Sequence, residues 1–215
     1  MTRPGLLLTA LIAMLLSACK ADAPPAEEVA VPAGSAGAAA IDPALSSQDA
    51  LAEVTASMDR FLAARSFHAS MRIEGERPMA SEMEFAAPDR YRIDLPVGTQ
   101  IIIGDTMYMD MHGQRTRVPI PEGTISQWRD PLKIAQNLDG LSAEFLGSEP
   151  LQGIPARKYQ VRHSFPEPGE FTYWVGADGL PLQLRHSGQG EGGPYVMTLR
   201  YSRYNDPGIR VMVPE

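Results

Sequence analysis

The stretch Ala87–Gly113, APDRYRIDLPVGTQIIIGDTMYMDMHG, decides the fold of this chain, because apolar side chains recur in it at every second position. The alternating apolar residues are Tyr91, Ile93 and Leu95 in one run and Met107, Met109 and Met111 in the next. A period of two is typical of a strand with one apolar and one wet face. Glycine, proline and aspartate between the runs favour chain reversal. The stretch therefore predicts a meander of adjacent antiparallel strands.

The same alternation continues on both sides of this stretch. Before it the apolar positions are Phe67, Ala69, Met71, Ile73, Met83 and Phe85. After it they are Ala143, Phe145, Tyr159, Val161, Phe171, Tyr173, Val175, Leu182, Leu184, Tyr195, Met197, Leu199 and Tyr201. Between these two sets, from Pro121 to about Leu138, the strand pattern lapses, and the sequence predicts a second helical segment there.

One segment near the start of the domain has a helical period. Leu51, Val54, Met58, Phe61 and Leu62 recur at three to four residues. Ser46 or Ser47 precedes them as a capping residue, and Asp49 lies in the first turn. The pattern predicts an amphipathic helix that ends near Arg65.

About ten or eleven short strands with one long interruption predict a single domain over residues 46–215. The expected fold class is mainly β with helices (α+β). We expect one curved antiparallel sheet that forms an unclosed half-barrel covered by one or two helices, because a sheet of that size must curl or close. The rival architecture is a two-sheet sandwich.

The first 18 residues predict a secretory signal peptide. Arg3 precedes an apolar run, Leu6–Leu16, that is too short to span about 30 Å of hydrocarbon. The run ends in Leu16–Cys19, which resembles the bacterial lipobox, and Cys19 is the only cysteine. The resemblance implies that Cys19 becomes the first mature residue, carries lipid, and anchors the protein to a membrane. Lys20 rather than aspartate follows it, which by analogy with enteric bacteria implies the outer membrane, facing the periplasm.

Residues 19–45 are dominated by Ala, Pro, Gly and Glu and predict a disordered tether behind the acylated cysteine. The formal net charge is −7, and no stretch concentrates Lys or Arg. Nucleic acid is therefore excluded as an expected partner, because its binding rests mainly on basic side chains.

The order of signal peptide, lipobox, tether, helix and two meanders resembles unclosed-barrel lipoproteins. The chain is similar to carriers and receptors of the LolA and LolB type and to the lipid-binding lipoproteins of the LppX and LprG group. The resemblance rests on Ala87–Leu95, Ile101–Gly113, Tyr173–Arg185 and Tyr201–Pro207, which are sheet and turn features. It implies a half-barrel that holds a lipid or another hydrophobic ligand without covalent chemistry, in lipid or lipoprotein transport.

Apolar strand positions supply the expected wall of the ligand cavity. They are Phe67, Met71, Ile73, Met83, Phe85, Tyr91, Ile93, Met107, Met109, Met111, Phe171, Tyr173, Leu182, Leu184, Met197 and Leu199. Common catalytic and phosphate-binding motifs are missing from the sequence. We therefore expect no catalytic residue, no cofactor and no metal site, and a protein that is not an enzyme.

Two alternatives remain open. The domain acts as an envelope sensor or assembly partner that binds protein through open strand edges. Alternatively, the strand Met107–His112 binds Cu(I), because thioether sulfur and imidazole are suitable ligands. The histidines His68, His112, His163 and His186 are otherwise ordinary strand or turn residues, although His163 and His186 both lie in Arg-His-Ser triplets and would approach each other if their strands paired.

Overall fold

The computed structural model describes residues 45–121, 140–164, 168–190 and 192–213. The expected signal peptide (1–18), Cys19 and all but the last residue of the expected tether (19–45) lie outside the described residues. Apart from Pro121, the expected helical segment 121–138 also lies outside them. Within the described ranges, no helix combines the length and the apolar character that crossing a bilayer requires.

Helix α1 spans Ser47–Ala63, and Ser46 is its N-cap, as the sequence predicts. The backbone N–H of Asp49 donates to Oγ of Ser46 at 3.2 Å, which satisfies one of the free amides of the first turn. The buried face of the helix consists of Ala50, Val54, Ser57, Met58 and Phe61, at the spacing of one helical stripe.

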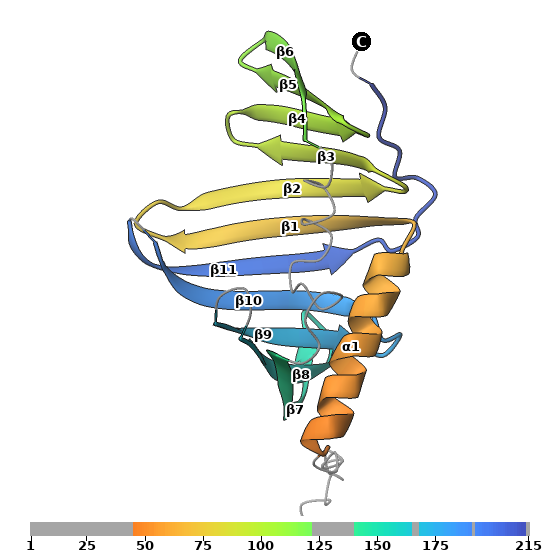
Figure 1. The fold of residues 1–215 in the computed structure, drawn as a ribbon, viewed down its shortest axis with the longest axis vertical. Coiled ribbons are helices and arrows are strands. Elements are labelled where there is room, and N and C mark those ends of the chain that lie inside the picture. The colour runs from red at the N-terminus through yellow and green to blue at the C-terminus, as the bar shows by residue number, and fades with distance from the viewer. Residues whose placement is uncertain (1–44, 122–139, 165–167, 191, 214–215) are drawn as a thin grey trace, which may run out of the picture. The chain divides into compact units, whose positions relative to one another are not determined.

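The eleven strands of the described chain form one antiparallel sheet (Figure 1). They are β1 (Ser66–Gly75), β2 (Met79–Ala86), β3 (Arg90–Leu95), β4 (Gly98–Ile103), β5 (Thr106–Met111), β6 (Gln114–Pro119), β7 (Leu141–Leu151), β8 (Ile154–His163), β9 (Gly169–Gly176), β10 (Pro181–Gly190) and β11 (Gly193–Ser202). Their order in the sheet is β6-β5-β4-β3-β2-β1-β11-β10-β9-β8-β7. The single open sheet confirms the expected half-barrel class, and the expected alternative of a two-sheet sandwich is wrong.

The first and last strands join the two meanders in the middle of the sheet. β1 pairs with β11 from His68↔Ser202 to Gly75↔Tyr195. The edges are β6 and β7, which follow each other in the chain and do not pair. The sheet is therefore open between these two strands.

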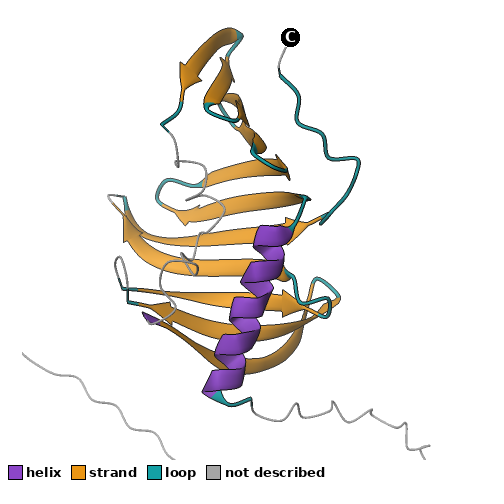
Figure 2. Ribbon diagram, turned by 45° about the vertical axis from the view of Figure 1, so that its right-hand side comes forward, coloured by secondary structure: helices purple, strands orange, loops and turns teal. Residues whose placement is uncertain are grey.

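The α1 helix lies across one face of the curved sheet, near one end of the strands (Figure 2). We call this the inner face and the opposite one the outer face. The core forms where the helix covers the sheet: Phe61 of α1 lies 4.8 Å from Phe67 of β1 and 5.1 Å from Tyr201 of β11, measured between ring centroids.

The residues after β11 close the end of the sheet beside the helix. The side-chain oxygen Oδ1 of Asn205 accepts a hydrogen bond from the backbone N–H of Arg65 at 2.8 Å. The Tyr204 hydroxyl donates to the carbonyl of Pro181 at 2.8 Å. Ile209 and Val211 are buried. The terminal segment therefore runs along the strand ends, as Figure 1 shows.

Candidate functional site

Aromatic side chains form the core of the inner face. Strand pairing places Phe67, Phe85, Tyr91 and Ile102 in one row across β1–β4. Neighbouring rings in this row lie about 5 Å apart, 5.1 Å for Phe67–Phe85 and 5.0 Å for Phe85–Tyr91. Six of the expected wall residues are fully enclosed in this core: Phe67, Phe85, Tyr91, Phe171, Tyr173 and Leu184. They hold the sheet and the helix together.

Further along the strands the inner face becomes more open. Eight apolar side chains there are only half-buried, and we call them the apolar patch: Met71, Ile73, Met83, Ile93, Met107, Met109, Met197 and Leu199. Six of them are direct neighbours in pairs, because Met71 pairs with Leu199, Ile73 with Met197, and Met83 with Ile93. All eight are among the expected wall residues.

The apolar patch offers van der Waals contact and few groups that could form hydrogen bonds. Five of its eight members are methionines, whose unbranched and polarisable side chains adapt to irregular apolar partners. Two polar residues interrupt it. Ser81 pairs with Met71, and Gln100 lies between Ile93 and Met109. Neither residue is among the expected wall residues, although the alternation of their neighbours places both on the inner face.

Helix α1 is fixed to the second meander by polar contacts. The hydroxyls of Ser57 and Tyr173 lie 3.2 Å apart in the core, and Arg157 of β8 forms an ion pair with Glu53. Burial raises the pKa of the Tyr173 hydroxyl, so the group stays neutral and able to hydrogen-bond. The helix is thereby held over β7–β10, and the patch on the other strands is left partly open.

The expected wall residue Leu182 lies on the wrong face. The register of β10 against β9 shifts between Pro181 and Gln183, so the strict alternation is interrupted at Leu182. A side chain at Gly176 would meet the Leu182 methyl group on the outer face. Met111 stays in register with the inner face, but it is 39% exposed at the rim.

The histidines do not gather into one site in the described chain. His163 and His186 lie on strands that flank β9 instead of pairing, opposite Gly169 and Phe171 respectively. Nδ1 of His186 lies 2.8 Å from the carbonyl oxygen of Glu170. His112 occupies a turn with a positive φ of 54°. The geometry does not test Cu(I) binding by Met107, Met109 and Met111, which stays a prediction.

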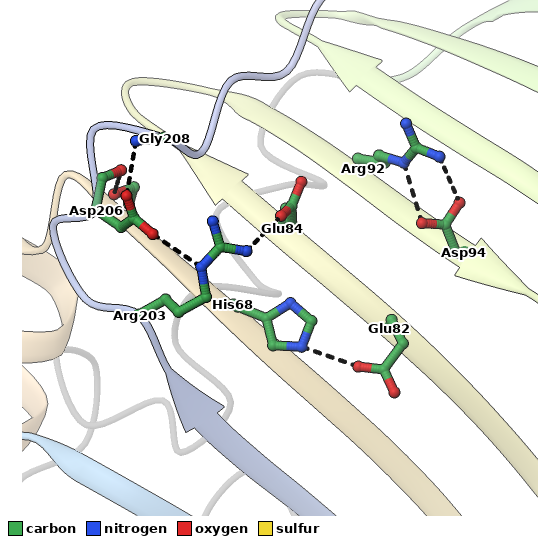
Figure 3. A network of polar contacts seen from close by, with 9 residues as sticks. His68, Glu82, Glu84, Arg92, Asp94, Arg203, Asp206 and Gly208 are labelled. Atoms are coloured by element: carbon green, nitrogen blue, oxygen red, sulfur yellow. Dashed lines mark hydrogen bonds and ion pairs between the residues drawn. The ribbon is translucent and has the colours of Figure 1, made fainter.

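The outer face is charged where the inner face is apolar (Figure 3). His68 lies 3.0 Å from Glu82, and Arg203 lies 3.1 Å from Glu84. Burial alone would raise the pKa of Asp94, but hydrogen bonds from Arg92 and Thr99 outweigh it and hold that pKa below its usual value. The two faces therefore offer different chemistry, and among the described residues the extended apolar surface lies on the inner face.

Comparison with solved structures identifies the fold. The crystal structure of the Mycobacterium tuberculosis lipoprotein LppX matches 78% of this chain and 100% of its own, with a TM-score of 0.59 and 17% sequence identity. LprF from Mycobacterium bovis matches 79% of this chain and 97% of its own, with a TM-score of 0.54 and 11% identity. No protein-family model and no curated protein matches the sequence.

A LolA superfamily protein, NE2245 from Nitrosomonas europaea, matches 79% of this chain and 96% of its own, with a TM-score of 0.28 and 10% sequence identity. LppX and LprF are matched over almost their whole length, with TM-scores above 0.5. The described chain therefore has the unclosed-barrel fold of LppX and LprF, as its resemblance to the LppX and LprG group implies.

Proposed function

We propose that this protein is a membrane-anchored lipoprotein of the cell envelope that binds a lipid or another hydrophobic ligand on the inner face of its sheet. The observation that carries the proposal is the apolar patch, which continues the core beyond the reach of α1 and leaves eight apolar side chains half-buried. Monomeric soluble proteins rarely expose large contiguous apolar patches without a partner for them. An acyl chain is such a partner.

The free energy gained by burying an acyl chain on the apolar patch supports an acyl ligand. Each methylene removed from water contributes about 0.8 kcal/mol, so a chain with eight buried methylenes gains roughly 6 kcal/mol before the costs of binding. A methionine-rich wall can follow a flexible chain without fixed hydrogen bonds. Reversible transport of lipid or lipoprotein across the envelope needs this kind of non-covalent binding, and it needs no cofactor.

Retention of ligand tests the proposal. The full chain carrying Cys19→Ser, which cannot be acylated, is mixed with fluorescent phospholipid or fatty acid and passed through gel filtration. We expect the ligand to elute with the protein, and native mass spectrometry to show a defined number of bound molecules. If neither measurement finds retained ligand, the proposal fails.

The anchor is part of the proposal and has its own test. The lipobox-like Leu16–Cys19 and the tether-like residues behind it motivate an acylated Cys19. Growth with radiolabelled palmitate should label the wild-type protein and leave Cys19→Ser unlabelled. Membrane fractionation should then place the labelled protein with the outer membrane, and recovery with the inner membrane would refute the inference from Lys20.

A second candidate function is binding of an envelope protein through a strand edge. The observation that favours it is β6, an edge strand whose residues Gln114–Arg117 are exposed. Edge strands offer unpaired backbone groups to a further strand. Photocrosslinking in living cells from position 115 would support this function if one protein were captured while lipid occupancy stayed negligible, and it would refute it if no defined protein were captured.

A further inference from the structure

The outer face carries a hollow that the apolar patch does not explain. Its volume is about 830 Å³, and it lies over β3–β6, between the β3–β4 and β5–β6 turns. This volume falls in the range of small-molecule sites, roughly 300–1,000 Å³. The hollow lies mainly on the opposite side of the sheet from α1, because its lining includes Arg92 and Tyr108, which alternate with the inner-face residues Ile93 and Met107. Met109 of the apolar patch borders it at the edge of the sheet.

The floor of the hollow is one row of side chains across four strands. Arg92 pairs with Ile101, Ile101 with Tyr108, and Tyr108 with Arg117. Strands lie about 4.8 Å apart, so the row spans about 14 Å. An isoleucine and a tyrosine therefore form an apolar floor between two guanidinium groups.

The neighbouring row contains two aspartates whose carboxylates already accept hydrogen bonds. Asp94 accepts from Nε of Arg92 at 3.0 Å and from Oγ1 of Thr99 at 2.7 Å. Asp110 accepts from Nε of Arg115 at 3.2 Å and from the backbone N–H of Gly113 at 3.2 Å. These bonds hold the side chains in place and neutralise two of the three arginines.

The third arginine is differently placed. Within the described chain, the guanidinium carbon of Arg117 lies over the ring of Tyr108, 5.6 Å from its centroid. No described carboxylate forms an ion pair with it. The hollow thus holds three arginines against two aspartates in a chain whose formal net charge is −7. It is a local positive site with a flat apolar floor.

We propose that this hollow is a second ligand site, independent of the apolar patch, for a small planar organic acid. The acidic group of the ligand pairs with the guanidinium of Arg117, which offers a fork of N–H donors to a carboxylate. The flat part of the ligand lies against Ile101 and Tyr108. The ion pairs of Arg92 and Arg115 fix the walls.

An NMR titration tests this site directly. The full chain carrying Cys19→Ser is labelled with ¹⁵N and titrated with naphthalene-2-carboxylate, and in parallel with the uncharged naphthalene-2-carboxamide. We expect saturable shifts of the amides of Ile101, Tyr108 and Arg117 with the acid, and an affinity for the carboxamide at least about tenfold weaker. A charge-assisted hydrogen bond is worth a difference of this order.

Variants separate the site from non-specific binding. Arg117→Gln should weaken binding of the acid about tenfold or more, and Arg117→Lys should retain part of the affinity because the charge remains. Arg185→Gln removes an exposed arginine of β10 outside the hollow and should change nothing. Shifts confined to the apolar patch, equal affinity of acid and carboxamide, or full affinity of Arg117→Gln would each overturn the proposal. Lipid retention should be unaffected by Arg117→Gln.

Discussion

The hydroxyl oxygens of Ser57 on α1 and Tyr173 on β9 lie 3.2 Å apart inside the core. Ser57 is fully buried and Tyr173 is 1% exposed, so water cannot substitute for either partner. The bond fixes the helix over the second meander. It thereby determines which part of the inner face the helix covers and which part, the apolar patch, is left half-buried.

Breaking this pair from one side should destabilise the domain. Tyr173→Phe leaves the Ser57 hydroxyl without its partner, and Ser57→Ala does the same to Tyr173, at a cost of about 1–3 kcal/mol each. The double variant removes both polar groups and should cost less than the sum of the two. Urea unfolding of the four proteins measures this coupling; additive losses would show that the hydroxyls do not interact.

The two faces of the sheet should respond differently to the same type of substitution. Met71→Gln and Met197→Gln together place two amides in the apolar patch, and each should cost about 1–2 kcal/mol of acyl-chain contact. We expect at least a tenfold loss of fatty-acid affinity in a fluorescence displacement assay. Leu182→Gln, on the outer face, is the matched control and should bind normally. Equal losses in both variants would place the ligand elsewhere.

Affinity should depend on the length of the acyl chain. Because one buried methylene contributes about 0.8 kcal/mol, shortening palmitate to myristate removes about 1.6 kcal/mol, or roughly a tenfold increase in Kd. Calorimetric titration with fatty acids of roughly ten to eighteen carbons measures the slope of affinity against chain length. A Kd independent of chain length would argue against burial of the chain.

The terminal segment should be sensitive to acid through Asp206. A hydrogen bond from the backbone N–H of Gly208, and then one from Arg203, lower the pKa of this carboxyl in the folded protein. The ionised form therefore stabilises the fold above pH 4 or so, and this contribution is lost as the pH falls through the folded-state pKa.

Asp206→Asn should accordingly reduce the pH dependence of the unfolding free energy between about pH 5 and pH 2. Urea unfolding at several pH values measures it. Asp59→Asn, which removes an exposed carboxylate of α1, provides the control. If the slope of Asp206→Asn equals that of the wild type, the contacts of Asp206 do not contribute to stability.

Local patterns in the sequence predicted the elements well where burial is one-sided. The helix from Ser47 and the strand Thr106–Met111 both have one apolar stripe, whose period reports the backbone conformation. Strands without that contrast were harder to recognise. Gly98–Ile103 contains three consecutive isoleucines, and Gln114–Pro119 is mostly polar, because it is an edge strand.

Features that depend on distant pairing could not be read from local periods. The pairing of β1 with β11 joins residues that are 120 or more positions apart, and no local signal encodes it. The register shift beside Leu182 reverses the face of one residue in a run that otherwise alternates. The outer hollow arises because strand pairing sets Ile101 between Arg92 and Tyr108. The sequence therefore indicated the apolar patch but not the hollow on the outer face.

The most direct test of the account is the location of a bound acyl chain. The full chain carrying Cys19→Ser and ¹³C-methyl methionine is mixed with a fatty acid that carries a nitroxide near its methyl end. We predict that the methyl signals of Met71, Met83 and Met197 broaden strongly, while that of Met212, 71% exposed in the terminal segment, stays sharp. Uniform broadening, or none at the patch, would contradict the claim that the inner face binds the ligand.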